Sequence, residues 1–501
     1  MKCGKSSVGF VTLAALIGGG IALDASAQTA PAPGQSWHYT LLPGSQLVDA
    51  RPGGGRPDFI LPLQGTFSLR LVQEGPLFST YAWDSIAWAA GTPGGPSYQV
   101  SGRGDFSLGG EVALVQTLFL EIHIDDGHAN RLCYFTNAPG PVDRWWPMIH
   151  VGVDQTNGTL VQQFHLEIFA APFQEIWFST AHGLTAGIWQ SPTNHVSGGD
   201  LLSATGRVVK RNQALTARLG FMPAVPDLGL DAADLLSGGE VAFSIEQDQF
   251  SERLGLLHGG DVLSDRGRVI TNYAALIGAF GPEPPPADEG LDALHFRPEG
   301  EIYFSVTNDF FSERLGRLVR RGDLLSSSGR IVKTSEELVA RFNPADPKAD
   351  YGLDAIYVWP SDEIWFSVET GFYGKDFTPY GTGDLLSDQG YVVYRNLDLV
   401  GAFQPLEDLA DFGLDALFLV TDVAAPPAAA GSLRCAAPLL DRNTGSVILG
   451  WRGPGRVFQV EKATNVLGPW QPISPILTEP PVIDVGAITK TTNGFYRVRE
   501  W

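Results

Sequence analysis

Short segments of the chain alternate between apolar and polar side chains, a pattern that is typical of β-strands with one buried face. In the segment EIYFSV at 301–306, Ile302, Phe304 and Val306 fall on one side and the residues between them fall on the other. Gly and Asp residues separate such segments at short intervals, as they do in the turns of β-hairpins. The pattern predicts an all-β protein, with a short helical turn near 336–338.

Three phrases recur through the middle of the chain with a single period. The phrase G-D-x-L-S-x-x-G starts at 199, 260, 322 and 383, and GLDA starts at 229, 290, 352 and 413. A third phrase ends in F-S and reads QEIWFS at 174–179, GEVAFS at 239–244, GEIYFS at 300–305 and DEIWFS at 362–367. The copies of the first two phrases are spaced by 61, 62 and 61 residues. We therefore predict four copies of one unit of about 61 residues.

Each unit contains three or four predicted strands, and four-stranded units in tandem are typical of propeller blades. Residues 164–423 are therefore expected to form a four-repeat, β-propeller-like array, with open solenoid or bead-like packing as the alternative. The segment 164–170, FHLEIFA, has the pattern of a degraded first strand. The last GLDA phrase begins a strand without a unit of its own, and we expect strand material ahead of Gln174 to pair with it and seal a ring.

Eight aspartates recur at equivalent positions, and the simplest interpretation is that they bond backbone N–H groups in turns. They are Asp200, Asp261, Asp323 and Asp384 in the first phrase, and Asp231, Asp292, Asp354 and Asp415 in GLDA. The rival interpretation is cation binding, because four carboxylates gathered on an axis repel unless a cation or protons neutralise them. Calcium would suit such a site, although the phrase lacks the alternating oxygen ligands of an EF-hand loop. No cofactor is required by the sequence.

The loop between the F-S strand and the G-D phrase varies between units and is rich in aromatic residues. Variable loops of regular repeats tend to line one face, where aromatic rings stack against sugars or grip a protein. The candidate binding residues are Trp189, Phe250, Arg253, Phe310, Phe311, Arg314, Phe372, Tyr373 and Tyr380. The alternative is that the rings cover the unit edge as local core while the arginines pair with nearby acids.

Two further domains flank the repeats. Residues 37–163 read as alternating β segments with Gly turns, which predicts a β-sandwich or a small barrel. The segment EIHIDDGHAN offers a candidate metal site with nitrogen and oxygen ligands near one turn, at His123, Asp125, Asp126 and His128. Asp-Asp-Gly is also an ordinary hairpin turn, and this alternative stays open.

After a Pro/Ala-rich linker at 424–433, the segments 447–451, 457–465, 468–470 and 494–501 form a short final module. They resemble the B, C, C′ and F strands of a fibronectin type III-like or related immunoglobulin-like sandwich, with core positions at Trp451, Phe458, Val460, Tyr496 and Val498. The resemblance covers residues 434–501 and implies an architecture, not a catalytic activity. Taken whole, the chain resembles secreted multidomain repeat proteins of bacteria.

The first residues predict export. A short positive region, MKCGKSS, precedes the apolar run VGFVTLAALIGGGIAL and the small residues at 25–27, so residues 1–27 read as a signal peptide and 28–36 as a linker. No later segment has the length and apolar character of a membrane span. We expect an extracellular, cell-surface or periplasmic protein. Cys133 and Cys435 follow the predicted signal, and a bridge between them is not required by the sequence.

The formal net charge of −21 disfavours nucleic acid and anionic lipid as partners. Motifs such as G-x-S-x-G and H-E-x-x-H are absent from the sequence. The leading hypothesis is a non-catalytic interaction protein that binds an extracellular glycan or protein through the variable loops. The alternatives are a propeller-based glycosidase or lyase, which calcium would assist, and a purely structural cell-surface protein. An enzyme should bring unrepeated acids together with shifted pKa values, whereas an interaction protein should expose aromatic rings on an open face.

Overall fold

The computed structural model describes residues 36–53, 57–111, 113–189, 194–223, 225, 227–284, 287–288, 290–423, 432–487 and 494–501. Nearly all of the regular structure in these ranges is antiparallel β-sheet, as the alternating pattern predicts. The predicted signal peptide and linker at 1–35 and most of the 424–433 linker lie outside the described residues. None of the helices in the described ranges has the length and apolar character needed to cross a membrane.

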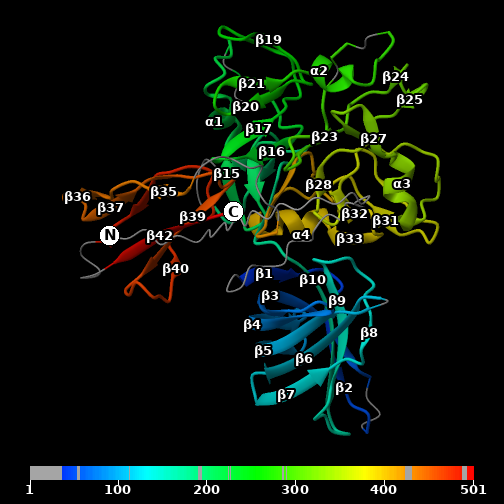
Figure 1. Cartoon of the computed structure of the whole chain (residues 1–501), viewed down its shortest axis with the longest axis vertical. Helices are drawn as coiled ribbons and strands as arrows, with labels where there is room; N and C mark the ends of the chain where they lie inside the picture. Colours follow the sequence, from blue (N-terminus) through cyan, green and yellow to red (C-terminus); the bar gives the residue numbers. More distant parts are fainter. Residues whose placement is uncertain are drawn as a thin grey trace, which may run out of the picture.

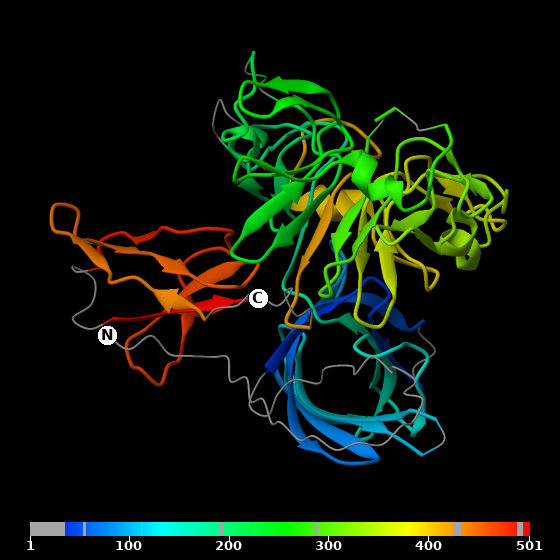
Figure 2. The ribbon, with the colours of Figure 1, turned by 45° about the horizontal axis from the view of Figure 1, so that its top comes forward.

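The N-terminal domain is one continuous sheet that closes on itself as a barrel (Figure 2). Its strands are β1 (Ser36–Leu41), β2 (Gln46–Ala50), β3 (Phe59–Glu74), β4 (Phe78–Gly91), β5 (Ser97–Gly109), β6 (Val115–Asp125), β7 (Asn130–Thr136), β8 (Gly140–Pro141), β9 (Ile149–Gln155) and β10 (Gln163–Ala171). Each strand from β3 to β7 pairs with the next one along the chain, and β7 also pairs with β9. Strand β10 pairs with β9, β1 and β2, and β1 and β2 each pair with β3, which closes the sheet.

Alternate side chains of the barrel strands fill its interior. Trp83 and Trp88 of β4 are buried there with Phe67 of β3 and Phe106 of β5. Cys133 is a free, buried thiol in this core, so it does not pair with Cys435. The barrel is therefore filled by its own side chains.

The segment 164–170 belongs to this barrel. It forms most of β10, which pairs with three other barrel strands, so the prediction that it is the first strand of the repeats is wrong. Its alternating pattern fits either role, and the sequence alone did not reveal that β2 and β9 are its pairing partners.

The repeated phrases form four four-stranded sheets of the same topology (Figure 1). Sheet 1 has the order β15 (Arg207–Lys210), β14 (Leu201–Ser203), β11 (Glu175–Phe178), β34 (Leu417–Val420); sheet 2 has β16 (Ala233–Leu236), β17 (Glu240–Phe243), β20 (Val262–Ser264), β21 (Arg268–Thr271); sheet 3 has β22 (Leu294–Phe296), β23 (Ile302–Phe304), β26 (Leu324–Ser326), β27 (Arg330–Lys333); sheet 4 has β28 (Ile356–Val358), β29 (Ile364–Phe366), β32 (Leu385–Ser387), β33 (Tyr391–Tyr394).

The last GLDA strand completes the first sheet. β34 pairs antiparallel with β11, so Glu175 lies opposite Val420 and Phe178 opposite Leu417. Each of β34, β16, β22 and β28 also contacts two of the others in cyclic order. The four sheets therefore form a closed ring in which the two ends of the repeat region share one sheet.

A repeated hydrogen bond joins each sheet to the next around this ring. The Ser of each F-S phrase is fully buried and donates its hydroxyl to the carbonyl of the Leu in the following GLDA phrase. The four bonds are Ser179 to Leu230 (2.9 Å), Ser244 to Leu291 (3.2 Å), Ser305 to Leu353 (2.7 Å) and Ser367 to Leu414 (2.7 Å). Because the fourth bond returns to the sheet that contains the first Ser, the series closes.

Each sheet carries a two-stranded hairpin and a short helix at the end where its GLDA phrase lies. The hairpins are β12 (Leu184–Thr185) with β13 (His195–Val196), β18 (Gln249–Ser251) with β19 (Gly255–Leu257), β24 (Phe310–Ser312) with β25 (Arg317–Val319), and β30 (Phe372–Tyr373) with β31 (Pro379–Tyr380). The helices are α1 (Asn212–Thr216), α2 (Tyr273–Gly278), α3 (Ser335–Val339) with η1 (Ala340–Phe342), and α4 (Asn396–Val400) with η2 (Gly401–Phe403). We call this side of the ring the hairpin face.

The C-terminal module has a three-stranded sheet β36-β37-β41, a three-stranded sheet β40-β39-β42 and the pair β35-β38. Its strands are β35 (Arg434–Cys435), β36 (Leu439–Asp441), β37 (Ser446–Leu449), β38 (Trp451–Arg452), β39 (Phe458–Ala463), β40 (Gln471–Pro472), β41 (Val482–Asp484) and β42 (Phe495–Glu500). Of the predicted core residues, Trp451, Phe458 and Val460 are buried, and Tyr496 and Val498 pack against them partly buried.

Both flanking domains contact the ring on the side opposite the hairpins, which we call the module face. The Gly238 amide, in the turn between β16 and β17, donates to the Gly455 carbonyl of the C-terminal module at 2.8 Å. Phe169 of the barrel packs edge-on against Tyr391, which begins β33, with 4.7 Å between ring centroids. The hairpin face is therefore the side of the ring that points away from both the barrel and the C-terminal module.

Candidate functional site

The aspartates of the G-D phrase hold the hairpin and the helix of each sheet together. Asp323 accepts the backbone N–H of Arg320 at one oxygen (3.1 Å) and that of Ser335, the first helical residue, at the other (3.0 Å). Asp200 and Asp384 accept N–H groups from the corresponding positions. These carboxylates satisfy backbone donors at a helix start and a turn, which is a structural task that every unit requires.

The Ser of the same phrase is bonded to the Glu that begins the second strand. Ser203 donates to Glu175 at 2.9 Å and Ser387 donates to Glu363 at 2.6 Å, and the other two units repeat the contact. Because the Asp and the Ser both make local bonds, the G-D-x-L-S phrase is repeated as scaffold.

The GLDA aspartates have a different environment. They precede β34, β16, β22 and β28, the strands that contact one another around the ring, and they lie close enough to act on one another electrostatically. Burial, followed by the neighbouring Asp415 and Glu246 carboxyls, raises the pKa of Asp231 to about 8. Burial and Glu246 raise the pKa of Asp415 to about 8, and burial with three other aspartates raises that of Asp354 well above its usual value. We call Asp231, Asp292, Asp354 and Asp415 the axial aspartates.

Two glutamates that occur in only two units join the axial aspartates. Glu246 and Glu369 follow the F-S phrase by two residues in the second and fourth units, where the other units have Ala181 and Thr307. Burial and then Asp292 raise the pKa of Glu369 to about 8, although Arg321 forms an ion pair with it. The cluster therefore contains acids that all four units share and acids that only two units have.

Two oxygens of the cluster lack a conventional donor. Oδ2 of Asp292 and Oε1 of Glu369 are buried and accept no N–H or O–H from the described residues. The two carboxyls lie close enough to act on each other electrostatically. Within the described ranges, no group of three or more His, Cys, Asp or Glu side chains is arranged to hold a metal ion.

A second group of buried polar side chains lies nearer the module face of the ring, where the C-terminal module covers it. His295 Nδ1 lies 3.6 Å from Asp234 Oδ2, and both side chains are buried. Arg456 of the C-terminal module is also buried, with Nη1 at 4.0 Å from Asp234 Oδ1, and it donates to the Phe296 carbonyl at 3.4 Å. Burial lowers the pKa of His295 well below its ordinary value, so Arg456 supplies the positive charge there.

Three of the predicted aromatic residues are exposed at one repeated position. Phe250, Phe311 and Tyr373 follow the buried Ser of the F-S phrase by six residues and are 52%, 46% and 61% exposed. Each pairs across its hairpin with an exposed apolar residue, which is Leu256, Leu318 or Pro379. In the first unit the corresponding pair is Thr185 and His195. Three units therefore present the same exposed apolar pair.

These hairpins are firmly anchored. The Phe250, Phe311 and Tyr373 carbonyls accept backbone N–H groups from the connector that follows the preceding helix, at 3.0, 3.2 and 2.8 Å. Ser251 and Ser312 are buried and donate to carbonyls of that preceding segment. The exposed rings are thus held on a fixed backbone, which lowers the entropy lost when a partner binds.

The four other predicted aromatic residues contribute to local core. Phe310 and Phe372 are buried, Trp189 packs against Phe403, and Tyr380 packs against Phe342. The alternative interpretation expected the two arginines to pair with acids, but neither forms an ion pair with a described acidic residue. Arg253 donates to the Arg218 carbonyl and Arg314 donates to the Ala279 carbonyl, and both acceptors precede the hairpin in sequence.

The segment around His123 forms a hairpin turn between β6 and β7. The Gly127 amide donates to Asp125, and the His128 and Ala129 amides donate to Asp126. Arg131 binds the second oxygen of Asp126 at 2.7 Å, and this bond lowers the pKa of Asp126. The carboxylates at the centre of the candidate metal site are therefore engaged as turn acceptors.

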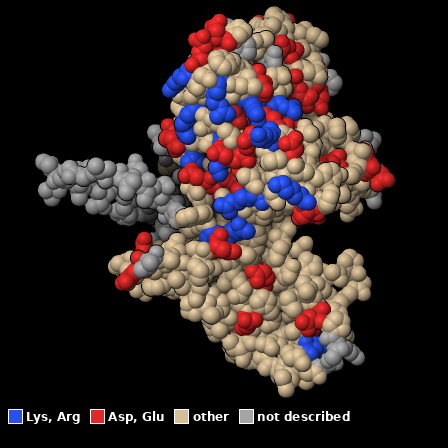
Figure 3. All heavy atoms as spheres, turned by 90° about the vertical axis from the view of Figure 1, so that its right-hand side faces the viewer, with Lys and Arg blue, Asp and Glu red and all other residues tan. Residues whose placement is uncertain are grey.

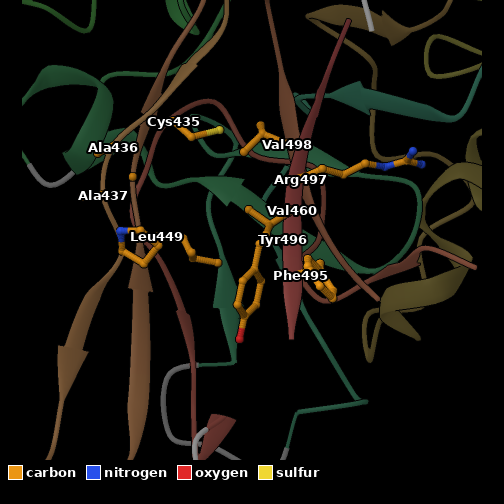
Figure 4. Close-up of a pocket in the computed structure, with 11 residues that line it drawn as sticks. Cys435, Ala436, Ala437, Leu449, Val460, Phe495, Tyr496, Arg497 and Val498 are labelled. Atoms are coloured by element: carbon orange, nitrogen blue, oxygen red, sulfur yellow. The ribbon is translucent and has the colours of Figure 1, made fainter. Parts of the chain in front are cut away.

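The C-terminal module contains an apolar pocket of about 430 Å³ between its sheets (Figure 4). Leu449 of β37 and Tyr496 and Val498 of β42 line it. The same residues contact the core of the module, so the pocket is the open part of the module's own core. Charged side chains are concentrated on one part of the surface. In the face shown in Figure 3, Lys, Arg, Asp and Glu gather over the ring and are sparse over the barrel below it.

Sequence reasoning missed the contribution of Glu246, Glu369 and Arg321. The available signal was the alternation of Glu with Ala or Thr at one position of otherwise regular units. The sequence analysis also gave the G-D aspartates and the GLDA aspartates the same role. A repeated Asp before an apolar residue has the same sequence pattern whether its side chain lies in a turn or in the cluster at the centre of the ring.

No protein-family model and no curated protein matches the chain. Among solved structures, a Bacteroides uniformis protein described as a candidate 6-phosphogluconolactonase is 12% identical over 89% of this chain and 99% of its own, with a TM-score of 0.16. PorZ, a surface component of the type-IX secretion system of Porphyromonas gingivalis, is 9% identical over 84% and 75%, also with a TM-score of 0.16. The extracellular domain of BT4673 from B. thetaiotaomicron has 9% identity over 88% and 86% and a TM-score of 0.12. Likenesses with such TM-scores carry no argument about this chain.

Proposed function

We propose that the protein is an exported, non-catalytic interaction protein that binds an extracellular glycan or protein through the hairpin face. The observation that carries this proposal is the exposed apolar pair that recurs at the same hairpin position in three units. Exposed rings on a fixed backbone suit stacking against sugar rings or packing in a protein interface. Three equivalent pairs on one rigid body suit a repetitive ligand, because each further contact is intramolecular after the first.

The architecture that we propose is a four-bladed, propeller-like ring with a fibronectin type III-like module at its C-terminal side. The serine bonds between neighbouring sheets and the pairing of β34 with β11 support the ring. The pairing orders β36-β37-β41 and β40-β39-β42 support the assignment of the module, because they match an A-B-E and a C′-C-F sheet. The export proposal rests on the sequence of residues 1–27, as does extracellular, cell-surface or periplasmic localisation.

A second candidate function is a carbohydrate-active enzyme. It is favoured by the axial aspartates with Glu246 and Glu369, because carboxyls whose pKa values are raised to about 8 are able to donate protons near neutral pH. Calcium binding is part of this second candidate function, because a cation would neutralise the cluster in place of protons. In an enzyme, Glu369→Gln should abolish turnover while binding persists.

The proposal is tested by screening the full chain on a glycan array with and without EDTA. We expect binding in both conditions, and we expect the triple variant Phe250→Ser, Phe311→Ser, Tyr373→Ser to lose it. Each ring contributes about 0.5–1.5 kcal/mol beyond its buried area, so single variants should weaken binding by about 2- to 10-fold. Phe78→Ser is the matched control, because Phe78 is equally exposed (47%) on the barrel. Binding that survives the triple variant, or that the control variant loses, would overturn the assignment.

A further inference from the structure

A pocket of about 560 Å³ lies beside α2 in the second unit, on the hairpin face. It is lined by Leu256 and His258 from the hairpin side, by Asp261, and by Asn272, Tyr273 and Asp288. The pocket includes the G-D aspartate of this unit. The other units show what normally occupies this position.

In the first and fourth units an arginine fills the equivalent place. Arg211 Nη1 donates to Asp200 Oδ2 at 2.6 Å and to the His195 carbonyl at 2.9 Å. Arg395 makes the same two contacts in the fourth unit, to Asp384 Oδ2 at 2.6 Å and to the Pro379 carbonyl at 2.8 Å. The guanidinium thus bridges the buried carboxylate and the second strand of the hairpin.

The third unit supplies a cation by another route. Thr334 stands at the position of Arg211, and Arg317 from the hairpin places Nη2 at 4.0 Å from Asp323 Oδ2. In the second unit both positions are uncharged, because Asn272 replaces the first arginine and Gly255 replaces the second. No ion pair of the described residues joins a Lys or Arg side chain to Asp261.

The side chain of Asn272 does not substitute for the missing arginine. It accepts the Ala275 amide at 2.8 Å and so caps α2. Asp261 is 6% exposed, and its Oδ2 accepts the His258 amide at 3.1 Å. Asp288, which accepts the Gly260 amide at 2.8 Å, adds a second carboxyl to the lining.

The walls also suit the apolar stem of a long basic side chain. Leu256, Ile277 and Pro282 line the pocket with the Tyr273 side chain. A side chain with a guanidinium at its end and methylenes along its length can therefore satisfy Asp261 and cover apolar surface at the same time. Leu256 has the same hairpin register as His195 and Pro379 in the other units.

We propose that this pocket receives an arginine side chain from a protein partner, in place of the arginine that the second unit lacks. We expect the occupant to be a guanidinium because the first and fourth units of this chain each place an arginine of their own at the equivalent position. The inference rests on the interaction function proposed above and selects a protein as a partner, although the pocket and the exposed rings can be tested separately.

The experiment is a calorimetric titration of the full chain with N-acetyl-arginine methylamide, with the uncharged N-acetyl-citrulline methylamide as the control ligand. We expect the arginine probe to bind the wild type at least tenfold more tightly than the citrulline probe. Asn272→Arg restores the internal arginine and should remove binding of the probe. Asn272→Gln, which leaves the pocket uncharged, should retain it.

A second measurement does not depend on how these variants fold. The ring protons of His258 should shift in the NMR spectrum when the arginine probe is added to the wild type, and should not shift with the citrulline probe. Equal binding of the two probes, or unchanged binding in a folded Asn272→Arg protein, would refute the site. The triple ring variant should bind the arginine probe like the wild type, so failure of the glycan assay and failure of this site give different results.

Discussion

Replacing Asp231 by Asn should stabilise the ring, and the gain should increase with pH. The folded protein holds Asp231 with a pKa of about 8, whereas an unfolded Asp has a pKa of about 3.9. Between these values the folded state binds more protons than the unfolded state, so stability is fully present below the unfolded pKa and is lost as pH rises through the folded pKa. Asn has the same shape and carries no charge, and it removes this penalty.

The size of the effect follows from the pKa difference. Each pH unit above the unfolded pKa costs about 1.4 kcal/mol until the folded pKa is reached, which gives an upper bound of about 4 kcal/mol at pH 7. The axial aspartates share their repulsion, and the protein relaxes around a charge, so we expect about half of this bound. At pH 5 the gain should fall below about 1.5 kcal/mol by the same reasoning.

The assay is urea unfolding followed by tryptophan fluorescence at pH 5 and pH 8, because Trp177, Trp359 and Trp365 are buried in the ring. Asp408→Asn is the matched control, since Asp408 is an exposed carboxylate of the same ring. The reasoning is refuted if Asp231→Asn is no more stable than the wild type at pH 8, or if the difference between them does not grow with pH.

Three further outcomes are expected. Ser305→Ala leaves the Leu353 carbonyl without its donor and should cost about 1–3 kcal/mol in urea unfolding; an unchanged midpoint would show that the ring does not depend on this bond. Arg456→Ala removes the cation beside buried Asp234 and should cost about 3–5 kcal/mol, measured in the same way; an unaltered transition would contradict that role. Burial raises the pKa of Asp231 and Asp415 to about 8, so these carboxyls can hold protons at pH 7 without a cation; EDTA should therefore leave the melting temperature unchanged, and a fall of several degrees would instead identify a bound cation.

The sequence predicted the repeated sheets well because their phrases carry both the strand pattern and the turn residues. Ile302 and Phe304 lie in β23, and the G-D aspartates cap turns as expected. It could not predict which aspartates meet on an axis, because Asp231 and Asp415 are brought together only by ring closure. The segment 164–170 was misassigned for the same reason, since its strand pattern carries no information about its partners.

The aromatic residues show a similar limit. Phe310 and Phe311 are adjacent in sequence, and strand alternation requires that they point to opposite sides. Which of the two is exposed depends on the preceding connector, which packs on one side of the hairpin. Four of the seven predicted aromatic binding residues therefore became local core once the neighbouring segments were in place.

The most direct test of the account is hydroxyl-radical footprinting of the full chain with the strongest ligand from the array. The account predicts that Phe250, Phe311 and Tyr373 become protected from oxidation when the ligand is bound, while Phe78 on the barrel reacts as before. Protection confined to the barrel or to the C-terminal module, with the three hairpin rings unchanged, would contradict it.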